Sequence, residues 1–260
     1  MLTTTLLVTV GSMTALWMIS LWRRDASVVD VYWGPGFAVV GTVAAIAGEA
    51  TGPRSPLVLA LVALWGLRLG GYLWWRNRGT GEDFRYRSMR RRWGPRFWLV
   101  SLGTVFWLQA ALMWIVSLPV QLTVSAPGPR DLGFLDLAGG ALWLLGMYFE
   151  AGGDWQLARF KRDGRNAGKV MDRGFWRYTR HPNYFGDFLV WWGFYAFALA
   201  TPGAAWTIVG PVVMSVLLTR ISGVPLLERS LQKSRPGYAE YARRTSAFFP
   251  WPPRGAAPPS

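Results

Sequence analysis

Long apolar segments alternate with short polar segments along the whole chain of 260 residues. A helix needs about 20 mainly apolar residues to cross a bilayer, and seven segments come close to or exceed that length. They lie at about residues 3–22, 32–50, 56–75, 97–122, 132–152, 184–201 and 204–224. We interpret the first as a retained helix, because it lacks a basic start and is followed by Arg23 and Arg24. The pattern predicts an all-α integral membrane protein with seven transmembrane helices.

The basic residues fall in alternate connections between these segments. One side of the membrane receives residues 23–31, 76–96, 157–183 and the chain after 225, and the other receives 51–55, 123–131 and 202–203. Of the 28 Lys and Arg residues, only Arg54 and Arg130 lie on the second side. Connections rich in Lys and Arg stay in the cytoplasm. The asymmetry predicts an N-terminus outside and a cytoplasmic C-terminus, which requires an odd number of helices.

Composition and charge exclude several further classes of function. The formal net charge is +14, but the charge follows the membrane topology, so we expect no nucleic-acid partner. The chain has no cysteine and one histidine, which makes a metal site improbable on ligand count and excludes thiolate chemistry. Abundant Arg, Ala, Gly and Pro are typical of a GC-rich bacterial gene. The predicted location is the bacterial cytoplasmic membrane.

We expect a single membrane domain over residues 1–260 without an internal repeat, ending in a disordered tail at 254–260. Five ionisable residues fall within or beside apolar segments, where each needs a partner or water: Asp30, Arg68, Glu150, Asp187 and Arg220. Asp136 and Glu49 are predicted to be solvated loop ends.

The single histidine, His181, lies in a polar run from Arg177 to Asp187 that leads into an apolar segment. Polar groups are costly at such a place unless they hold something polar. Cations can bind phosphates, while carboxylates and amides can bind ribose hydroxyls. The sequence has no Gly-x-Gly-x-x-Gly after a strand, so a nucleotide would bind among helix ends. We expect His181 to hydrogen-bond a phosphate or ribose, with a pKa lowered by neighbouring positive charges.

Several segments together resemble the membrane steroid 5-alpha-reductase family, in particular its bacterial branch once catalogued as a domain of unknown function. The matching segments cover nearly the whole chain: Val29 to Gly34, Arg78 to Tyr86, Gln109 with Met113 and Trp114, Asp154 to Lys161, Gly174 to Asp187, Ser222 to Pro225, and then Glu228, Tyr238, Tyr241 and Pro250. The long segment around His181 and Pro182 is the most specific of them.

The resemblance implies an NADPH-dependent membrane reductase that transfers hydride to the beta carbon of a lipidic enone, such as a 3-oxo-delta-4 steroid. Helices in residues 1–122 would form the substrate cavity, and residues 132–250 would mainly bind NADPH from the cytoplasmic side. The expected partners are the enone and membrane lipids, with no obligate protein partner.

Site residues are carried over by position. The implied cofactor-binding residues are Asn77, Arg78, Asp154, Lys161, Lys169, Tyr178, Arg180, His181, Asn183, Tyr184, Asp187, Glu228 and Tyr241. Animal members hold the ketone with a glutamate and a tyrosine, and this chain has Tyr32-Trp33-Gly34 where that glutamate is expected. The catalytic candidates are therefore Tyr32 and Asp30, with Tyr86 behind them; a tyrosine can donate a hydrogen bond to a forming enolate.

Two other functions stay open. The C-terminal pattern of Arg-His-Pro, a later Glu and Tyr-x-x-Tyr also resembles membrane lipid or isoprenylcysteine methyltransferases, which use S-adenosylmethionine. The length of the match and the second basic loop at residues 76–92 favour the reductase, because S-adenosylmethionine has no phosphate to neutralise. A lipid carrier or transporter is disfavoured, since the sequence lacks the repeats common in transporters.

Overall fold

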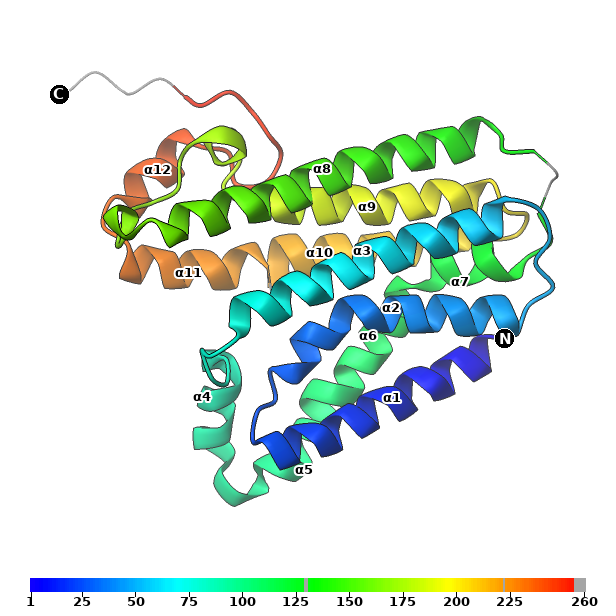
Figure 1. Ribbon diagram of the computed structural model, residues 1–260, viewed down its shortest axis with the longest axis horizontal. Helices are drawn as coiled ribbons and strands as arrows, with labels where there is room; N and C mark the ends of the chain where they lie inside the picture. The colour runs from blue at the N-terminus through cyan, green and yellow to red at the C-terminus, as the bar shows by residue number, and fades with distance from the viewer. Residues whose placement is uncertain (129–130, 222, 255–260) are drawn as a thin grey trace. The chain divides into compact units, whose positions relative to one another are not determined.

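The computed structural model describes residues 1–128, 131–221 and 223–254, and these residues form helices and connecting loops (Figure 1). In the described part of the chain the only β-interaction is an isolated bridge between Thr179 and Ser246. The chain divides into two compact units. The N-terminal unit comprises residues 1–136 and 197–210, and the C-terminal unit comprises 137–196 and the described residues from 211 onward.

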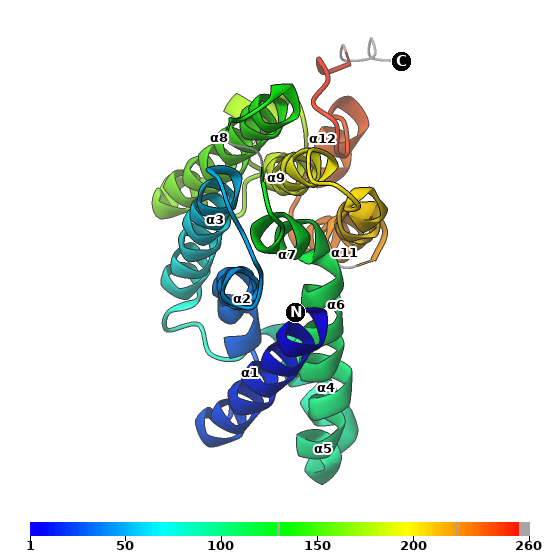
Figure 2. The same ribbon diagram turned by 90° about the vertical axis from the view of Figure 1, so that its right-hand side faces the viewer.

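Helices at the start of the chain build the N-terminal unit. They are α1 (Leu2–Arg23), α2 (Val28–Ile46), α3 (Arg54–Asn77), α4 (Phe84–Trp93), α5 (Phe97–Ser101), α6 (Leu108–Val116) and α7 (Leu118–Ser125). A π-helical segment, Leu102–Trp107, joins α5 to α6. Helix α2 lies between α1 and α3 in both views (Figures 1 and 2). Apolar side chains that point inward from α2 and α3, including Phe37 and Trp65, are fully buried.

Small residues bring α2 and α3 into backbone contact. A Cβ atom on Gly34 would overlap the carbonyl of Gly66, and one on Gly66 would overlap the carbonyl of Gly34. One turn further along α3, Gly70 leaves room for the ring of Pro35. Close approach through small residues is how helices associate where lipid removes the hydrophobic driving force. The pair therefore packs in a way that suits a bilayer.

Four helical stretches of the described residues are long and apolar enough to cross a membrane: Leu2–Arg23, Val28–Ile46, Arg54–Asn77 and Phe84–Val116. They correspond to the first four predicted segments. The last three predicted segments fall on α8 (Phe134–Arg162), α9 (Pro182–Leu199) and the apolar stretch Ala205–Ile221. These three do not meet the same combined requirement of length and apolar composition, so seven spans and their orientation stay predictions.

One loop and one apolar segment were assigned wrongly. Residues 76–96, expected as a polar connection, contain helix α4, which begins at a capping carboxylate where Asp83 accepts from the Arg85 N–H. The predicted segment 97–122 is interrupted, because a new helix, α7, starts at Leu118 with a proline in its first turn. Arg130, Ser222 and residues 255–260 of the expected tail lie outside the described residues.

The expectation that Asp136 is a solvated loop end was also wrong. Asp136 is 2% exposed, and its carboxylate accepts two hydrogen bonds from Arg54, at 2.6 and 2.9 Å. Arg54 also donates to the backbone oxygen of Ala200, 2.7 Å away. A two-pronged arginine–carboxylate pair satisfies both charges without water. Glu49, by contrast, is exposed as predicted.

The C-terminal unit contains most of α8, α9 and α10 (Val209–Val216), together with α11 (Val224–Ser234) and α12 (Tyr238–Arg244). Helices α8 and α9 lie side by side (Figures 1 and 2), and Gly146 and Gly186 let their backbones approach. Aromatic rings fill the space between these helices and the loop before α9: Phe149 lies 5.0 Å from Phe175 and 5.1 Å from Phe185, centre to centre. This packing fixes the loop that carries the histidine.

Candidate functional site

The loop before α9 carries the predicted histidine segment and is tied to the end of the chain. The Arg180 N–H donates to the Ser246 oxygen at 2.9 Å, and the Thr179 hydroxyl donates to the Phe248 oxygen at 2.8 Å. Thr179 and His181 are fully buried. The segment is therefore held in place from both sides before any ligand is considered.

Arg180, His181 and Glu228 form a network that we call the closed cluster. One carboxylate oxygen of Glu228 accepts from Arg180 Nε at 2.7 Å and lies 3.1 Å from His181 Nε2. A second nitrogen of Arg180 donates to the backbone oxygens of Ala242 and Thr245. The cluster thereby joins the start of α9 to α11 and α12. All three residues were expected to bind the cofactor. Here Arg180 and the Nε2 atom of His181 bond to Glu228, while the buried Nδ1 atom of His181 has no hydrogen-bond partner among the residues that the structure describes.

Burial, more than like charge, sets the protonation of His181. Burial lowers the pKa of the imidazole, and the positive charge of Arg180 adds to this, while Glu228 acts in the opposite direction. The predicted direction is the one found here, but its main cause is different. For Glu228, burial raises the pKa, yet the hydrogen bond from His181 and the charge of Arg180 outweigh it, so the net pKa is lowered. At neutral pH, the closed cluster therefore consists of a neutral His181, an ionised Glu228 and a positively charged Arg180.

Asn183 lies three residues after Arg180 and contacts a different helix. Its side-chain nitrogen donates to a carboxylate oxygen of Asp154 on α8, at 3.1 Å. Asp154 is 5% exposed, and Glu150, one turn earlier on α8, is 3% exposed. Gly153 permits this contact, because a Cβ there would press on Pro182 and on the Asn183 backbone nitrogen. The predicted shared face of Glu150 and Asp154 thus lies against the start of α9.

The other expected cofactor residues of this unit differ in exposure. Lys161, Lys169 and Tyr178 are exposed, Asp187 is half-buried, and the half-buried Tyr184 stacks on His181 with ring centres 5.4 Å apart. Tyr241 is buried, and its hydroxyl donates to the Trp176 oxygen. Tyr241 thus supports the loop before α9.

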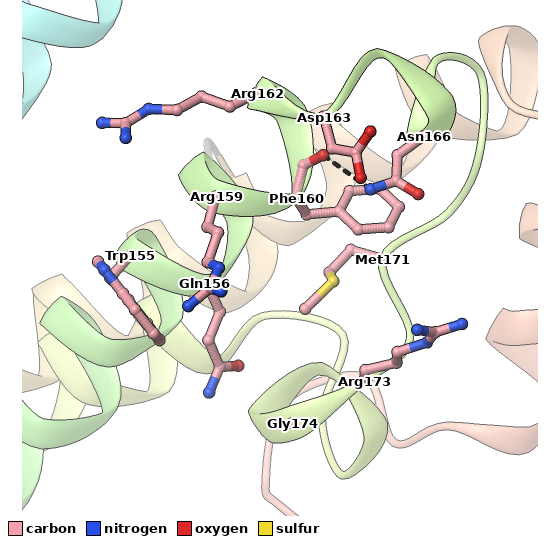
Figure 3. Close-up of a pocket in the computed structure, with 10 residues that line it drawn as sticks. All are labelled: Trp155, Gln156, Arg159, Phe160, Arg162, Asp163, Asn166, Met171, Arg173 and Gly174. Atoms are coloured by element: carbon pink, nitrogen blue, oxygen red, sulfur yellow. Dashed lines mark hydrogen bonds between the residues drawn. The ribbon is translucent and has the colours of Figure 1, made fainter.

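Sequence reasoning missed a hollow beside the end of α8, with a volume of about 630 Å³. Figure 3 shows Trp155, Gln156, Arg159 and Phe160 reaching it from α8, opposite Met171 from the following loop. The Gln156 oxygen accepts from the Phe175 N–H at 3.0 Å, which anchors one wall. Alternation of aromatic and basic residues along 155–162 was the signal that could have indicated it.

The catalytic candidates lie in the N-terminal unit, and two of them meet. The Tyr86 hydroxyl donates to Asp30 at 2.8 Å, and Arg85 donates to the other carboxylate oxygen at 2.7 Å. Tyr32, also on α2, is half-buried and near Gly36, where a Cβ would touch its ring. Asp30 therefore has an ion-pair partner that the sequence did not indicate, and the Tyr86 proton is directed at Asp30.

Asn77 and Arg78 are the expected cofactor residues of the same unit. Asn77 ends α3, and its side-chain oxygen accepts from Arg76 at 3.1 Å. Arg78 is exposed and its guanidinium lies 5.2 Å from the ring of Trp74. The next carboxylates are used internally: Glu82 pairs with Arg90 at 2.7 Å. The second basic loop is thus partly neutralised by its own acidic residues.

The fold defines a class, the all-helical proteins with several helices able to cross a membrane. Within it, the chain belongs to the family described as a protein of unknown function, DUF1295, whose model matches residues 16–245. An uncharacterised protein of Schizosaccharomyces pombe is 26% identical over 271 residues, covering 90% of this chain and 75% of that protein.

A second relative has a named activity. The rat 3-oxo-5-alpha-steroid 4-dehydrogenase 1 is 36% identical over 88 residues, which is 32% of this chain and 31% of the rat protein. The chain thus matches less than a third of that enzyme's length. No solved structure matches the chain.

Proposed function

We propose that the protein is an NADPH-dependent membrane reductase that transfers hydride to the beta carbon of a lipidic enone, with a 3-oxo-delta-4 steroid as the first substrate to test. The observation that carries the proposal is the local similarity to the rat steroid dehydrogenase. The apolar helices support it, because a lipidic substrate can reach a membrane protein from the bilayer.

The side chains of the C-terminal unit fit a dinucleotide. Asp154 and Asn183 place a carboxylate and a carboxamide together at the start of α9. Such groups bind ribose hydroxyls, and a carboxamide has two N–H donors, of which Asp154 takes one. Lys161 and Lys169 are exposed cations beside them in the sequence, suited to phosphates. When bound, NADPH would supply the hydride.

The closed cluster would then act by positioning. Arg180 and His181 hydrogen-bond to Glu228 and thereby fix the loop that leads to Asn183. Catalytic geometry depends on such support, because a small displacement of a binding group weakens the reaction strongly.

On the ketone side, Tyr32 becomes the better donor of the three candidates. Asp30 accepts from Arg85 and from Tyr86, so an ionised Asp30 has no proton to donate and Tyr86 already uses its own. A tyrosine hydroxyl can hydrogen-bond a ketone and stabilise the negative charge that forms on its oxygen during hydride addition.

Calorimetry of the purified full chain in detergent tests the cofactor. We expect saturable binding of NADPH in preference to S-adenosylmethionine, and about tenfold weaker NADPH binding in Asn183→Ala and Asp187→Ala. Asn166→Ala is a matched control, since Asn166 is a loop amide that donates to the Phe160 oxygen. Tighter binding of S-adenosylmethionine would replace the reductase with the methyltransferase.

Turnover tests the chemistry. NADPH oxidation should be followed with progesterone, testosterone and non-steroidal enones, in the wild type and in Tyr32→Phe. We expect the variant to reduce kcat at least tenfold with NADPH affinity unchanged, because only the hydroxyl is removed. Wild-type kinetics in Tyr32→Phe would clear Tyr32 of the ketone role, and no oxidation with any enone would count against the proposed reaction.

A further inference from the structure

A second hollow of the C-terminal unit, of about 1020 Å³, has five arginines among its ten lining residues. We call it the arginine pocket, and its basic residues are Arg173, Arg177, Arg243, Arg244 and Arg254. Two carboxylates, Asp172 and Glu240, also line it, which leaves three positive charges in excess. Arginines gathered around a hollow repel one another unless an anion is present.

Most of these arginines lack an acidic partner. Arg244 pairs with Asp172 at 2.6 Å. Within residues 1–128, 131–221 and 223–254, Arg173, Arg177 and Arg243 form no ion pair, although Arg180 in the same unit does. Arg173 also lines the first hollow, where Figure 3 shows its side chain pointing away from Gln156 and Trp155. Their charges are therefore available to an external group.

The walls of the arginine pocket are fixed by hydrogen bonds within the region formed by α12 and the segment after it, and between that region and the loop before α9. The Trp251 N–H donates to the Tyr178 oxygen and the Arg254 N–H donates to the Arg244 oxygen, both at 2.9 Å. The Tyr241 hydroxyl bonds the Trp176 oxygen from the inner side of α12. Because the backbone is held before binding, little order has to be gained when an anion arrives.

We propose that the arginine pocket binds a phosphate-bearing anion, and that a diphosphate or a phosphodiester headgroup engages at least two guanidinium groups at once. The planar fork of arginine matches two phosphate oxygens, which a lysine ammonium does not. The anion has two conceivable sources, a soluble phosphate compound or an anionic phospholipid. Phosphate chemistry is common to both.

The arginine pocket is distinct from the residues proposed for NADPH. Asp154, Asn183 and Asp187 do not line it, and the side chains of Arg180 and Tyr241 bond inside the unit instead of facing it. Binding here would accordingly be independent of the proposed reductase activity.

The test measures binding of two probes to the full chain in detergent at low ionic strength, where charge is least screened. The soluble probe is sodium pyrophosphate, and the lipid probe is dioctanoyl phosphatidylglycerol compared with dioctanoyl phosphatidylcholine. The pocket variant is Arg173→Gln with Arg177→Gln and Arg243→Gln. The control is Arg91→Gln with Arg92→Gln and Arg96→Gln, which removes three exposed arginines elsewhere.

We expect saturable binding of pyrophosphate, phosphatidylglycerol or both, weakened about tenfold in the pocket variant and unchanged in the control. Which probe binds identifies the source. If the triple variant does not fold, Arg177→Gln and Arg243→Gln alone should each weaken binding by a smaller factor. No saturable binding, or equal weakening in the control, overturns the proposal. Loss of NADPH binding in the pocket variant would overturn the independence of the site, and absence of NADPH binding in the wild type would leave the pyrophosphate result standing.

Discussion

The closed cluster and the arginine pocket both use arginine in the C-terminal unit, in opposite ways. Arg180 donates to Glu228 and to two backbone oxygens and is mostly buried. Arg173 and Arg243 are exposed beside a hollow and have no carboxylate partner in the described chain. A buried cation with its acceptors inside the fold stabilises the fold. Cations left around a hollow cost stability and are better explained by a ligand.

The largest effect should follow loss of the shared carboxylate. Glu228→Ala leaves Arg180 and His181 without their acceptor, and we expect a loss of roughly 3 kcal/mol in the free energy of unfolding. Thermal unfolding in detergent should show a lower Tm than in Glu240→Ala, which removes a carboxylate from the arginine pocket. Equal Tm values in the two variants would remove the distinction between the two regions.

Replacing the guanidinium of Arg180 by an ammonium, which keeps the positive charge, should lower the free energy of unfolding somewhat less than the loss of Glu228 does. In Arg180→Lys one ammonium cannot reach Glu228, Ala242 and Thr245 together. We expect a loss of about 2 kcal/mol, measured as a lower Tm, whereas Arg243→Lys should leave Tm unchanged. A stable Arg180→Lys would indicate that charge alone holds the cluster.

Acidification should weaken the closed cluster. The pKa of His181 is lowered in the folded protein, so the unfolded chain takes up a proton first as the pH falls below about 6.5. Stability should be complete above that pH and fall by at most about 1.4 kcal/mol per pH unit below it. Glu228, whose pKa is also lowered, adds to the loss below about 4.5.

Tm measured from pH 8 to pH 5 checks this in the wild type and in His181→Gln, whose amide can still donate to Glu228 but does not titrate in this range. The slope between pH 6.5 and pH 5 should flatten in the variant. The same slope in both proteins would exclude His181 as its source.

The smallest effect should come from the arginine pocket. The triple variant of Arg173, Arg177 and Arg243 to Gln relieves repulsion between exposed charges. The free energy of unfolding should therefore increase by no more than about 0.5 kcal/mol, which would appear as a slightly higher Tm. Added pyrophosphate should stabilise the wild type and leave this variant unaffected, since a ligand raises Tm only where it binds. A marked fall in Tm on neutralisation would show that these arginines support the fold.

The sequence predicted the helices better than it predicted their ends or partners. Apolar runs identify α1, α2 and α3 directly, because each is one uninterrupted helix that is long and apolar enough to cross a bilayer. Helix α4 was missed, since its charged residues resemble a loop and its N-cap, Asp83, has no apolar run behind it. A hydrophobic pattern reveals a helix only through its apolar residues, and α4 has few of them.

The hydrogen-bond partners of the site residues were harder to predict than the residues themselves. The spacing of Glu150 and Asp154 correctly indicated one helix face, and that face meets Asn183. The pairing of Arg180 with Glu228 joins residues 48 positions apart, and that of Arg85 with Asp30 joins residues 55 apart. Such pairs depend on how helices pack, which local sequence does not encode. For Arg180 and His181 the sequence predicted a ligand contact, and the structure adds a protein partner, Glu228, that the sequence did not indicate.

The pair of Arg54 and Asp136 constrains the order in which the chain can assemble. Asp136 is synthesised 82 residues after Arg54, and Ala200, the other acceptor, follows Arg54 by 146 residues. At about 5–20 residues per second, Arg54 waits roughly 4 to 16 s for its carboxylate and roughly 7 to 29 s for the carbonyl. During that interval water or lipid headgroups must solvate the guanidinium. The N-terminal unit therefore closes at this end only late in translation, after α9 has been made.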